Sequence, residues 1–169
     1  GYLTNENNIA QIKAALVLGI RDYFLKLGFK KAILGSSGGI DSAVVLTLAV
    51  EALGAENVTA ILMPSAHSSA HSVDDAVQLS KNLGNPYHTI GIGNLYDGFL
   101  AALDPLFSGT NFGVAEENIQ SRTRGNLLMA IANKFYRAKT TVEKQQYAEL
   151  YKQSLKPYPV DVSEYRMPE

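Results

Sequence analysis

Serine and glycine make up most of residues 36–42, a short stretch that lies between two apolar segments. The segment before it, residues 31–34, has the length of a buried strand, and residues 41–53 have the pattern of an apolar helix that ends at Gly54. Strand, loop and helix therefore follow one another directly. This order limits the possible folds, because a strand that leads into a helix usually pairs in parallel with the next strand.

The same order recurs along the chain. The predicted strands are residues 31–34, 58–63 and 87–92, and the predicted helices are residues 9–27, 41–53, 72–83, 95–107 and 116–135. We expect the middle helix to begin at Ser72, because Asp75 follows three residues later as in a capping box. The aromatic residues Tyr96, Phe99 and Phe107 have helical spacing and are expected in the core. The alternation predicts an α/β fold, a doubly wound parallel sheet with helices on both faces.

Composition excludes several classes of protein. The 169 residues are 46% hydrophobic and carry a net charge of −1, from 15 basic and 16 acidic residues without a basic run. We therefore expect one sizeable core and no nucleic-acid partner. There is no cysteine, which excludes disulfides, thiolate zinc sites and cysteine nucleophiles. No apolar stretch is long enough to cross a bilayer, so we expect a cytoplasmic protein without a membrane partner.

Ligands of parallel α/β sheets bind beyond the carboxyl ends of the strands. The loops expected at that edge are residues 35–40, 64–71 and 91–94. The first loop is the most informative of the three, because it places small residues between a buried strand and the N-terminus of a helix. Such a position binds anions through backbone N–H groups and the helix dipole.

The residue types of the first loop suit a phosphate ligand. Gly38 and Gly39 let the backbone approach phosphate oxygens closely, and the hydroxyls of Ser37 and Ser42 can donate further hydrogen bonds. A carboxylate would repel phosphates, so the expected role of Asp41 is to hold a Mg²⁺ ion that bridges carboxylate and phosphate. A purely structural alternative is that Asp41 complements the helix dipole and the serines cap the helix.

The loop is neither a Walker A sequence nor the G-x-G-x-x-G fingerprint. It resembles the S-G-G-x-D-S signature of PP-loop ATP pyrophosphatases, which cleave ATP between the α and β phosphates. A wider resemblance, over roughly residues 15–135, is to NAD synthetases, and more specifically to the ligase domain of the glutamine-dependent type. The stretches that carry this resemblance are residues 31–43, 49–58, 63–65, 71–76 and 117–125.

The resemblance implies a reaction and a set of ligands. NAD synthetases amidate deamido-NAD with ammonia, through an adenylated intermediate that forms at the expense of ATP and releases AMP and pyrophosphate. It implies Mg²⁺, a homodimer or larger homo-oligomer, and, in the glutamine-dependent type, a separate amidase domain that this sequence lacks. The protein would position groups and neutralise charge, without a covalent catalytic residue.

The resemblance also assigns residues. Arg122 matches the arginine of the family that binds deamido-NAD, and Asp41 matches its Mg²⁺ ligand. The match of Arg124 to a ligand-binding position is weaker, and a solvated arginine on a helix is the alternative for both. The residues implied to bind ATP are Gly35, Ser36, Ser37, Gly38, Gly39, Ile40, Asp41 and Ser42.

The sequence departs from the family pattern at two places. Ser36 stands where NAD synthetases usually have an aliphatic residue. The family also continues beyond its last matched helix with a strand and a Thr-Thr-Gly-Asn-Lys-Ser-Glu-like loop that contacts ATP and Mg²⁺. Thr140, Thr141 and Glu143 follow Phe135 here without the glycine or the strand, so none of those roles is assigned to them.

The predicted organisation is therefore a PP-loop NAD synthetase domain at residues 1–135 and an unmatched segment at residues 136–169. Omitted residues, a truncated chain or a divergent member would each explain the missing loop. If the chain is complete, we expect weak ATP binding and little ligase activity. Another PP-loop ATP pyrophosphatase and a catalytically impaired nucleotide-binding fragment remain alternative functions.

Overall fold

The computed structural model describes residues 5–66 and 68–135. Its elements are α1 (Glu6–Leu27), β1 (Ala32–Gly35), α2 (Ile40–Leu53), the 3-10 turn η2 (Ala55–Asn57), β2 (Val58–Leu62), α3 (Ala70–Leu83), β3 (Tyr87–Thr89), α4 (Gly93–Phe107) and α5 (Val114–Phe135). The strands form one parallel sheet in the order β1-β2-β3. The predicted α/β fold is confirmed, whereas the segment at residues 136–169 lies outside the described residues.

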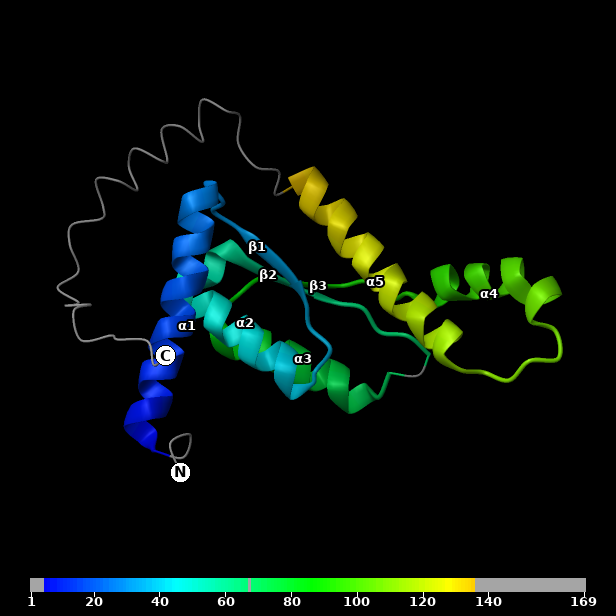
Figure 1. Cartoon of the computed structure of the whole chain (residues 1–169), viewed down its shortest axis with the longest axis horizontal. Coiled ribbons are helices and arrows are strands. Elements are labelled where there is room, and N and C mark those ends of the chain that lie inside the picture. Colours follow the sequence, from blue (N-terminus) through cyan, green and yellow to red (C-terminus); the bar gives the residue numbers. More distant parts are fainter. Residues whose placement is uncertain (1–4, 67, 136–169) are drawn as a thin grey trace, which may run out of the picture.

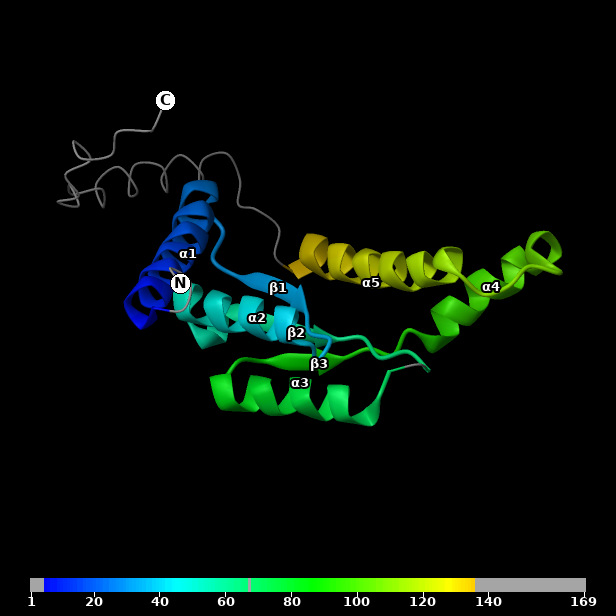
Figure 2. The ribbon, with the colours of Figure 1, turned by 60° about the horizontal axis from the view of Figure 1, so that its bottom comes forward.

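The sheet is the middle layer of three, with α2 and α3 on one face and α5 on the other (Figure 2). All five residues of β2 are buried, because a strand lies on each side of it and helices cover both its faces. Alternate side chains point to opposite faces. Val58 and Ala60 pack with Leu46 of α2, whereas Ile61 packs with Leu128 of α5.

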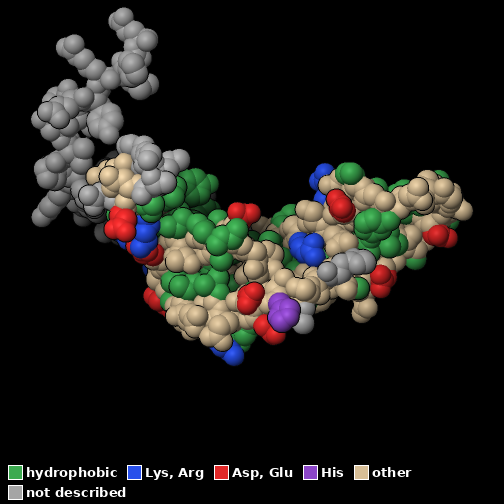
Figure 3. All heavy atoms as spheres, turned by 90° about the horizontal axis from the view of Figure 1, so that it is seen from below, with side chains coloured by type: hydrophobic (Ala, Val, Ile, Leu, Met, Phe, Trp, Pro, Cys, Tyr) green, Lys and Arg blue, Asp and Glu red, His purple; other side chains and the backbone are tan. Residues whose placement is uncertain are grey.

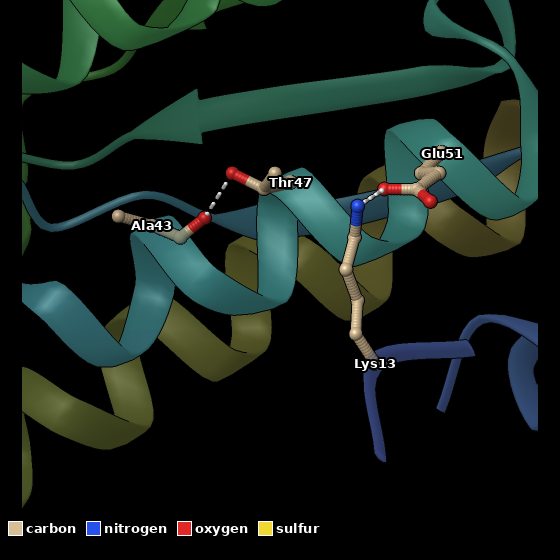
Figure 4. Close-up of polar contacts among 4 residues, drawn as sticks. All are labelled: Lys13, Ala43, Thr47 and Glu51. Atoms are coloured by element: carbon tan, nitrogen blue, oxygen red, sulfur yellow. Dashed lines mark hydrogen bonds and ion pairs between the residues drawn. The ribbon is translucent and has the colours of Figure 1, made fainter. Parts of the chain in front are cut away.

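Helix α1 packs against α2 at the edge of this core (Figure 1). Lys13 Nζ lies 2.7 Å from Glu51 Oε2, and the Arg21 Nε–H group donates to the carbonyl oxygen of Ala52 over 3.3 Å. Figure 4 shows Lys13 of α1 reaching this carboxylate, and the Thr47 hydroxyl bonded to the Ala43 carbonyl at 2.8 Å within α2. The ion pair is about half exposed, so it contributes roughly 0–1 kcal/mol.

The predicted amphipathic helix near the N-terminus is confirmed as a helix, but most of its apolar positions are exposed. Ile9 is 51% and Leu16 is 50% exposed, and Val17 is buried instead. The helical spacing therefore predicted the secondary structure without predicting burial. None of the helices in those ranges is long and apolar enough to span a membrane.

Helix α4 and the N-terminal end of α5 form an arm that extends away from the sheet, whereas the rest of α5 lies over the sheet (Figures 1 and 2). Tyr96 is buried as predicted, but Phe99 is 46% exposed, so the prediction that it lies in the core is wrong. The reason is that α4 packs mainly on α5 and has no sheet beneath it. Exposed hydrophobic side chains appear in green on this arm and across the other half of the same face in Figure 3.

All five helices begin one to three residues before the predicted start, and hydrogen bonds account for two of these differences. Helix α3 begins at Ala70, two residues before the predicted start, because the Ser69 hydroxyl caps it by accepting the Ser72 N–H at 3.1 Å. Helix α5 begins at Val114, and the buried Glu116 carboxylate accepts the Gly113 N–H at 2.7 Å. Both helices therefore begin two residues before the predicted start.

The third strand is shorter than predicted. β3 ends at Thr89, although the Ile90 and Ile92 N–H groups still donate to the carbonyls of Leu62 and Pro64 at 2.8 and 2.9 Å. Ile92 is fully buried in the core on the α5 side of the sheet. The apolar run therefore continues alongside β2, but as irregular backbone.

Candidate functional site

The loop after β1 leaves the sheet at the carboxyl end of the strand, as predicted. The Ser36 N–H donates to the Ile61 carbonyl at 2.9 Å, which continues the pairing of β1 with β2 by one residue beyond Gly35. The chain then turns into α2, whose N-cap is Gly39. The predicted strand, loop and helix are therefore confirmed around residues 36–39.

Hydrogen bonds within the loop use the hydroxyl groups of both serines. The Ser42 hydroxyl donates to the Gly39 carbonyl at 2.9 Å and accepts the Ser37 N–H at 3.2 Å. The Ser37 hydroxyl accepts the Gly39 N–H at 3.2 Å and lies 3.1 Å from Ser42 Oγ. Because a serine carries one hydroxyl proton, Ser37 is the donor to Ser42. In this conformation the serines stabilise the loop, and neither proton is left for a ligand.

Backbone N–H groups remain as the loop's donors. Gly39 lacks a side chain, and no side chain within the described ranges caps the first turn of α2. The N–H groups at the start of a helix have no partner in the helix itself, and they carry the positive end of the helix dipole. The loop therefore presents an uncapped helix N-terminus, a suitable site for an anion.

Gly38 holds the loop close to α3. Its φ of +81° belongs to the left-handed region, and a Cβ atom at this position would overlap the carbonyl oxygen of Ser72. Both observations require glycine. The first turns of α2 and α3 thus lie on either side of one glycine.

Asp41 is exposed in the first turn of α2. A carboxylate in the second position of an uncapped helix could reach a cation held by a ligand above the loop. Across the described ranges there is no cluster of three or more His, Asp or Glu residues that could hold a metal ion by itself. A cation at Asp41 would therefore need further oxygen ligands from a bound substrate or water.

A cavity of about 730 Å³ opens at the carboxyl ends of β1 and β2, between α3 and α5. That volume is within the range of about 300–1,000 Å³ that is typical of small-molecule sites. Its lining residues are Gly35, Ser36, Ser37, Leu62, Met63, Pro64, Ser68, Ser69, Ser72, Val73, Ser121, Arg124, Gly125 and Leu128. The first two predicted loops thus contribute to one cavity, whereas residues 91–94 do not line it.

Helix α5 supplies a second wall of the cavity. Ser121, Arg124, Gly125 and Leu128 line the cavity, and their spacing of three, four and seven residues places them on one face of the helix. Arg122 is exposed and does not line the cavity. The i, i+3, i+4, i+7 spacing is present in the sequence, but only Leu128 of the four residues is apolar, so apolar periodicity does not reveal this face of the helix.

Ser36 lies beneath the loop and is 5% exposed. Its hydroxyl has no hydrogen-bond partner within the described residues. An unsatisfied buried hydroxyl costs about 1–3 kcal/mol. Ser36→Ala is therefore expected to raise the free energy of unfolding by about 1 kcal/mol, measured as a higher urea midpoint at an unchanged slope.

Ser37→Ala is the matched control, because the Ser37 hydroxyl has two partners in the loop. The control should lower the stability of the chain. A Ser36→Ala variant that is as destabilised as Ser37→Ala would contradict the assignment of an unsatisfied hydroxyl at Ser36.

Comparison with known proteins places this geometry in a family. The family model described as NAD synthase matches residues 12–149. The chain belongs to the NAD synthase family. Its membership agrees with the resemblance found in the sequence. The match runs past residue 135, and the predicted boundary between the domain and the C-terminal segment stays a prediction.

Curated members of the NAD synthase family include close relatives. A glutamine-dependent NAD(+) synthetase from Synechocystis is 64% identical over 121 residues, which cover 72% of this chain and 22% of that protein. The enzyme of the same name from Thermotoga maritima is 46% identical over 142 residues, which cover 81% of this chain and 25% of that protein. The chain thus spans about a quarter of the length of these relatives.

Solved structures of NAD synthase relatives share the fold. A glutamine-dependent NAD+ synthetase from Acinetobacter baumannii, in complex with ADP, is 42% identical with a TM-score of 0.74, over 76% of this chain and 24% of that one. An NMN synthetase from Francisella tularensis is 31% identical with a TM-score of 0.68, over 76% of this chain and 51% of that one. The sheet and its covering helices are therefore those of the PP-loop fold.

Proposed function

We propose that this chain serves the ATP-dependent amidation of deamido-NAD to NAD, through an adenylated intermediate and with release of AMP and pyrophosphate. The observation that carries the proposal is the uncapped N-terminus of α2, which directly follows a loop whose first residues, Ser36 and Ser37, line the cavity. Membership of the NAD synthase family supports the choice of reaction. The relative crystallised with ADP supports an adenine nucleotide as one ligand.

The proposed ATP site is the loop and the first turn of α2. In this proposal the backbone of Gly38 and Gly39 and the helix dipole bind the phosphates, and Ser37 and Ser42 hold the loop in shape. Their part in the reaction is to orient the phosphate chain, so that the substrate carboxylate meets the α-phosphate in line. The proposed contact of Arg122 with deamido-NAD would lie outside the cavity, since this side chain is exposed.

Mg²⁺ is the proposed cofactor, and its ligand in this chain would be Asp41. Asp41 is suited to bind Mg²⁺ because it is an exposed carboxylate in the turn that would face the proposed phosphates. When bound, the ion would neutralise charge on the phosphates. The phosphates and water would complete its coordination.

The proposed partners are deamido-NAD and ammonia, the latter supplied directly or from glutamine by an amidase domain. A homodimer or larger homo-oligomer is also proposed, and the exposed hydrophobic side chains of α4 and α5 support an extended contact surface. The cytoplasmic location stays a prediction.

Turnover by the 169-residue chain tests the proposal. The protein is incubated with ATP, Mg²⁺, deamido-NAD and ammonium, and AMP, pyrophosphate and NAD are measured. Formation of the three products in equal amounts supports the proposal. Asp41→Asn should reduce the rate of NAD formation by about 100-fold, the usual scale for a lost electrostatic contact in a transition state. Asp22→Asn, on the distant α1, is the charge-matched control.

Two other outcomes would overturn the proposal. Pyrophosphate release that depends on a different acceptor would identify another PP-loop ATP pyrophosphatase. Binding of ATP without pyrophosphate release would identify a catalytically impaired nucleotide-binding fragment.

A further inference from the structure

The cavity between α3 and α5 contains a single charged side chain. Of its lining residues, all within the described ranges, Arg124 is the one cationic member and none is acidic. Six of the others are serines, which can donate or accept hydrogen bonds without adding charge. A guanidinium group in a cavity without a carboxylate is suited to an anionic ligand.

The backbone of β2 orients this guanidinium group. The Arg124 Nε–H group donates to the Met63 carbonyl oxygen over 3.1 Å, a contact between residues 61 positions apart in the chain. This hydrogen bond uses the Nε atom and leaves the two terminal nitrogen atoms, for which no partner is found within the described residues. The terminal nitrogens form the planar fork that pairs with two oxygens of a phosphate. The side chain is half-buried, so its position is fixed before a ligand arrives.

Helix geometry distinguishes Arg124 from Arg122. Residues two positions apart point about 200° from each other around a helix, so one of the two arginines faces the cavity and the other faces away. Thr123 between them is 3% exposed, and its hydroxyl donates to the Ile119 carbonyl within α5 at 2.8 Å. The rotation of α5 about its axis therefore places Arg124, and not Arg122, on the cavity face.

We propose that Arg124 contacts a phosphate of ATP bound in this cavity and sets the preference of the site for a charged nucleotide. The inference rests on the proposed function, and it adds a binding residue on α5, opposite the glycine loop. A phosphate chain that starts at the N-terminus of α2 would then be held from two sides, by backbone N–H groups and by the guanidinium fork. The hydrogen bond to the Met63 carbonyl ties the position of the Arg124 side chain to the end of β2.

Affinity measurements on three variants of the 169-residue chain test this inference. Arg124→Gln, Arg122→Gln and Lys134→Gln each remove one positive charge from α5. Calorimetric titration with ATP should give a dissociation constant about tenfold or more higher for Arg124→Gln, the scale of a lost charge-assisted hydrogen bond. Lys134 is exposed in the last turn of α5 and is the charge-matched control, so Lys134→Gln should change this constant by less than about twofold.

Adenosine and Arg124→Lys separate phosphate contact from a merely structural role. Adenosine carries no phosphate, so its affinity should be the same for the wild type and Arg124→Gln. Arg124→Lys keeps the charge without the fork, so it should recover part of the ATP affinity. The thermal midpoint of each variant reports any damage to the fold.

Three results would overturn the inference. They are an unchanged ATP affinity in Arg124→Gln, an equal loss of adenosine and ATP affinity, and a larger loss of ATP affinity in Arg122→Gln. Absence of ATP binding in the wild type would instead overturn the proposed function itself. The two failures are therefore distinguishable.

Discussion

Gly38→Ala is expected to destabilise the chain by about 2–4 kcal/mol, because a side chain at this position meets two separate costs. The φ of +81° costs an alanine of the order of 1 kcal/mol or more. The new Cβ would also overlap the Ser72 carbonyl oxygen, which is backbone and cannot rotate aside. The first turn of α3 must shift, and the loop must shift with it. Urea denaturation followed by circular dichroism measures the effect.

Two other glycines separate these costs. Gly84 has a φ of +73° and open space around its Cβ position, so Gly84→Ala measures the backbone cost alone, about 1 kcal/mol. Gly39 has a negative φ and its Cβ would lie 3.3 Å from Ser37 Oγ, so Gly39→Ala should be milder than Gly38→Ala. If Gly84→Ala and Gly38→Ala prove equally destabilising, the contact with Ser72 has no energetic weight.

Leu46→Ala is expected to lower the free energy of unfolding by about 3 kcal/mol, since large-to-small core substitutions cost about 2–5 kcal/mol. Leu46 is 0% exposed and lies in the cluster that joins α2 and α3 to β2. Removal of its side chain leaves a cavity between the helices and the sheet. The urea midpoint should fall while the slope stays constant.

Val45→Ala is the matched control for Leu46→Ala, because Val45 is adjacent on α2 and 53% exposed. It should cost no more than about 1 kcal/mol, since most of its side chain is already in water. Equal effects of the two variants would show that the α2 face of the sheet is not the core of the fold.

The sequence was a good guide where neighbouring residues decide the structure. The positions of β1, β2 and α2 follow from local apolar runs, and the three strands pair in parallel as the alternation predicted. Burial was harder to predict, because Ile9 and Phe99 have the spacing of core residues but are 51% and 46% exposed. Periodicity reports which face of a helix is apolar, and tertiary packing decides whether that face is covered.

The candidate site was predictable on one wall only. The loop from Ser36 to Asp41 carries a local signature, so its position after β1 could be predicted. The opposite wall depends on the rotation of α5 against β2, which is fixed by long-range contacts such as that of Arg124 with Met63. A sequence pattern does not contain that rotation, so it could not predict that Arg124 lines the cavity.

The close approach of Gly38 to Ser72 limits how the cavity can enlarge. At that contact two backbone segments already touch, so the first turn of α3 has no room to move closer to the loop. On the α5 side, a Cβ built on Gly125 would meet no atom within 4 Å. Nucleotide analogues with bulky groups should therefore be tolerated when the added group points toward Gly125, and rejected when it points toward Ser72. For the design of chemical probes, the cavity has one rigid side, near Ser72, and one adaptable side, near Gly125.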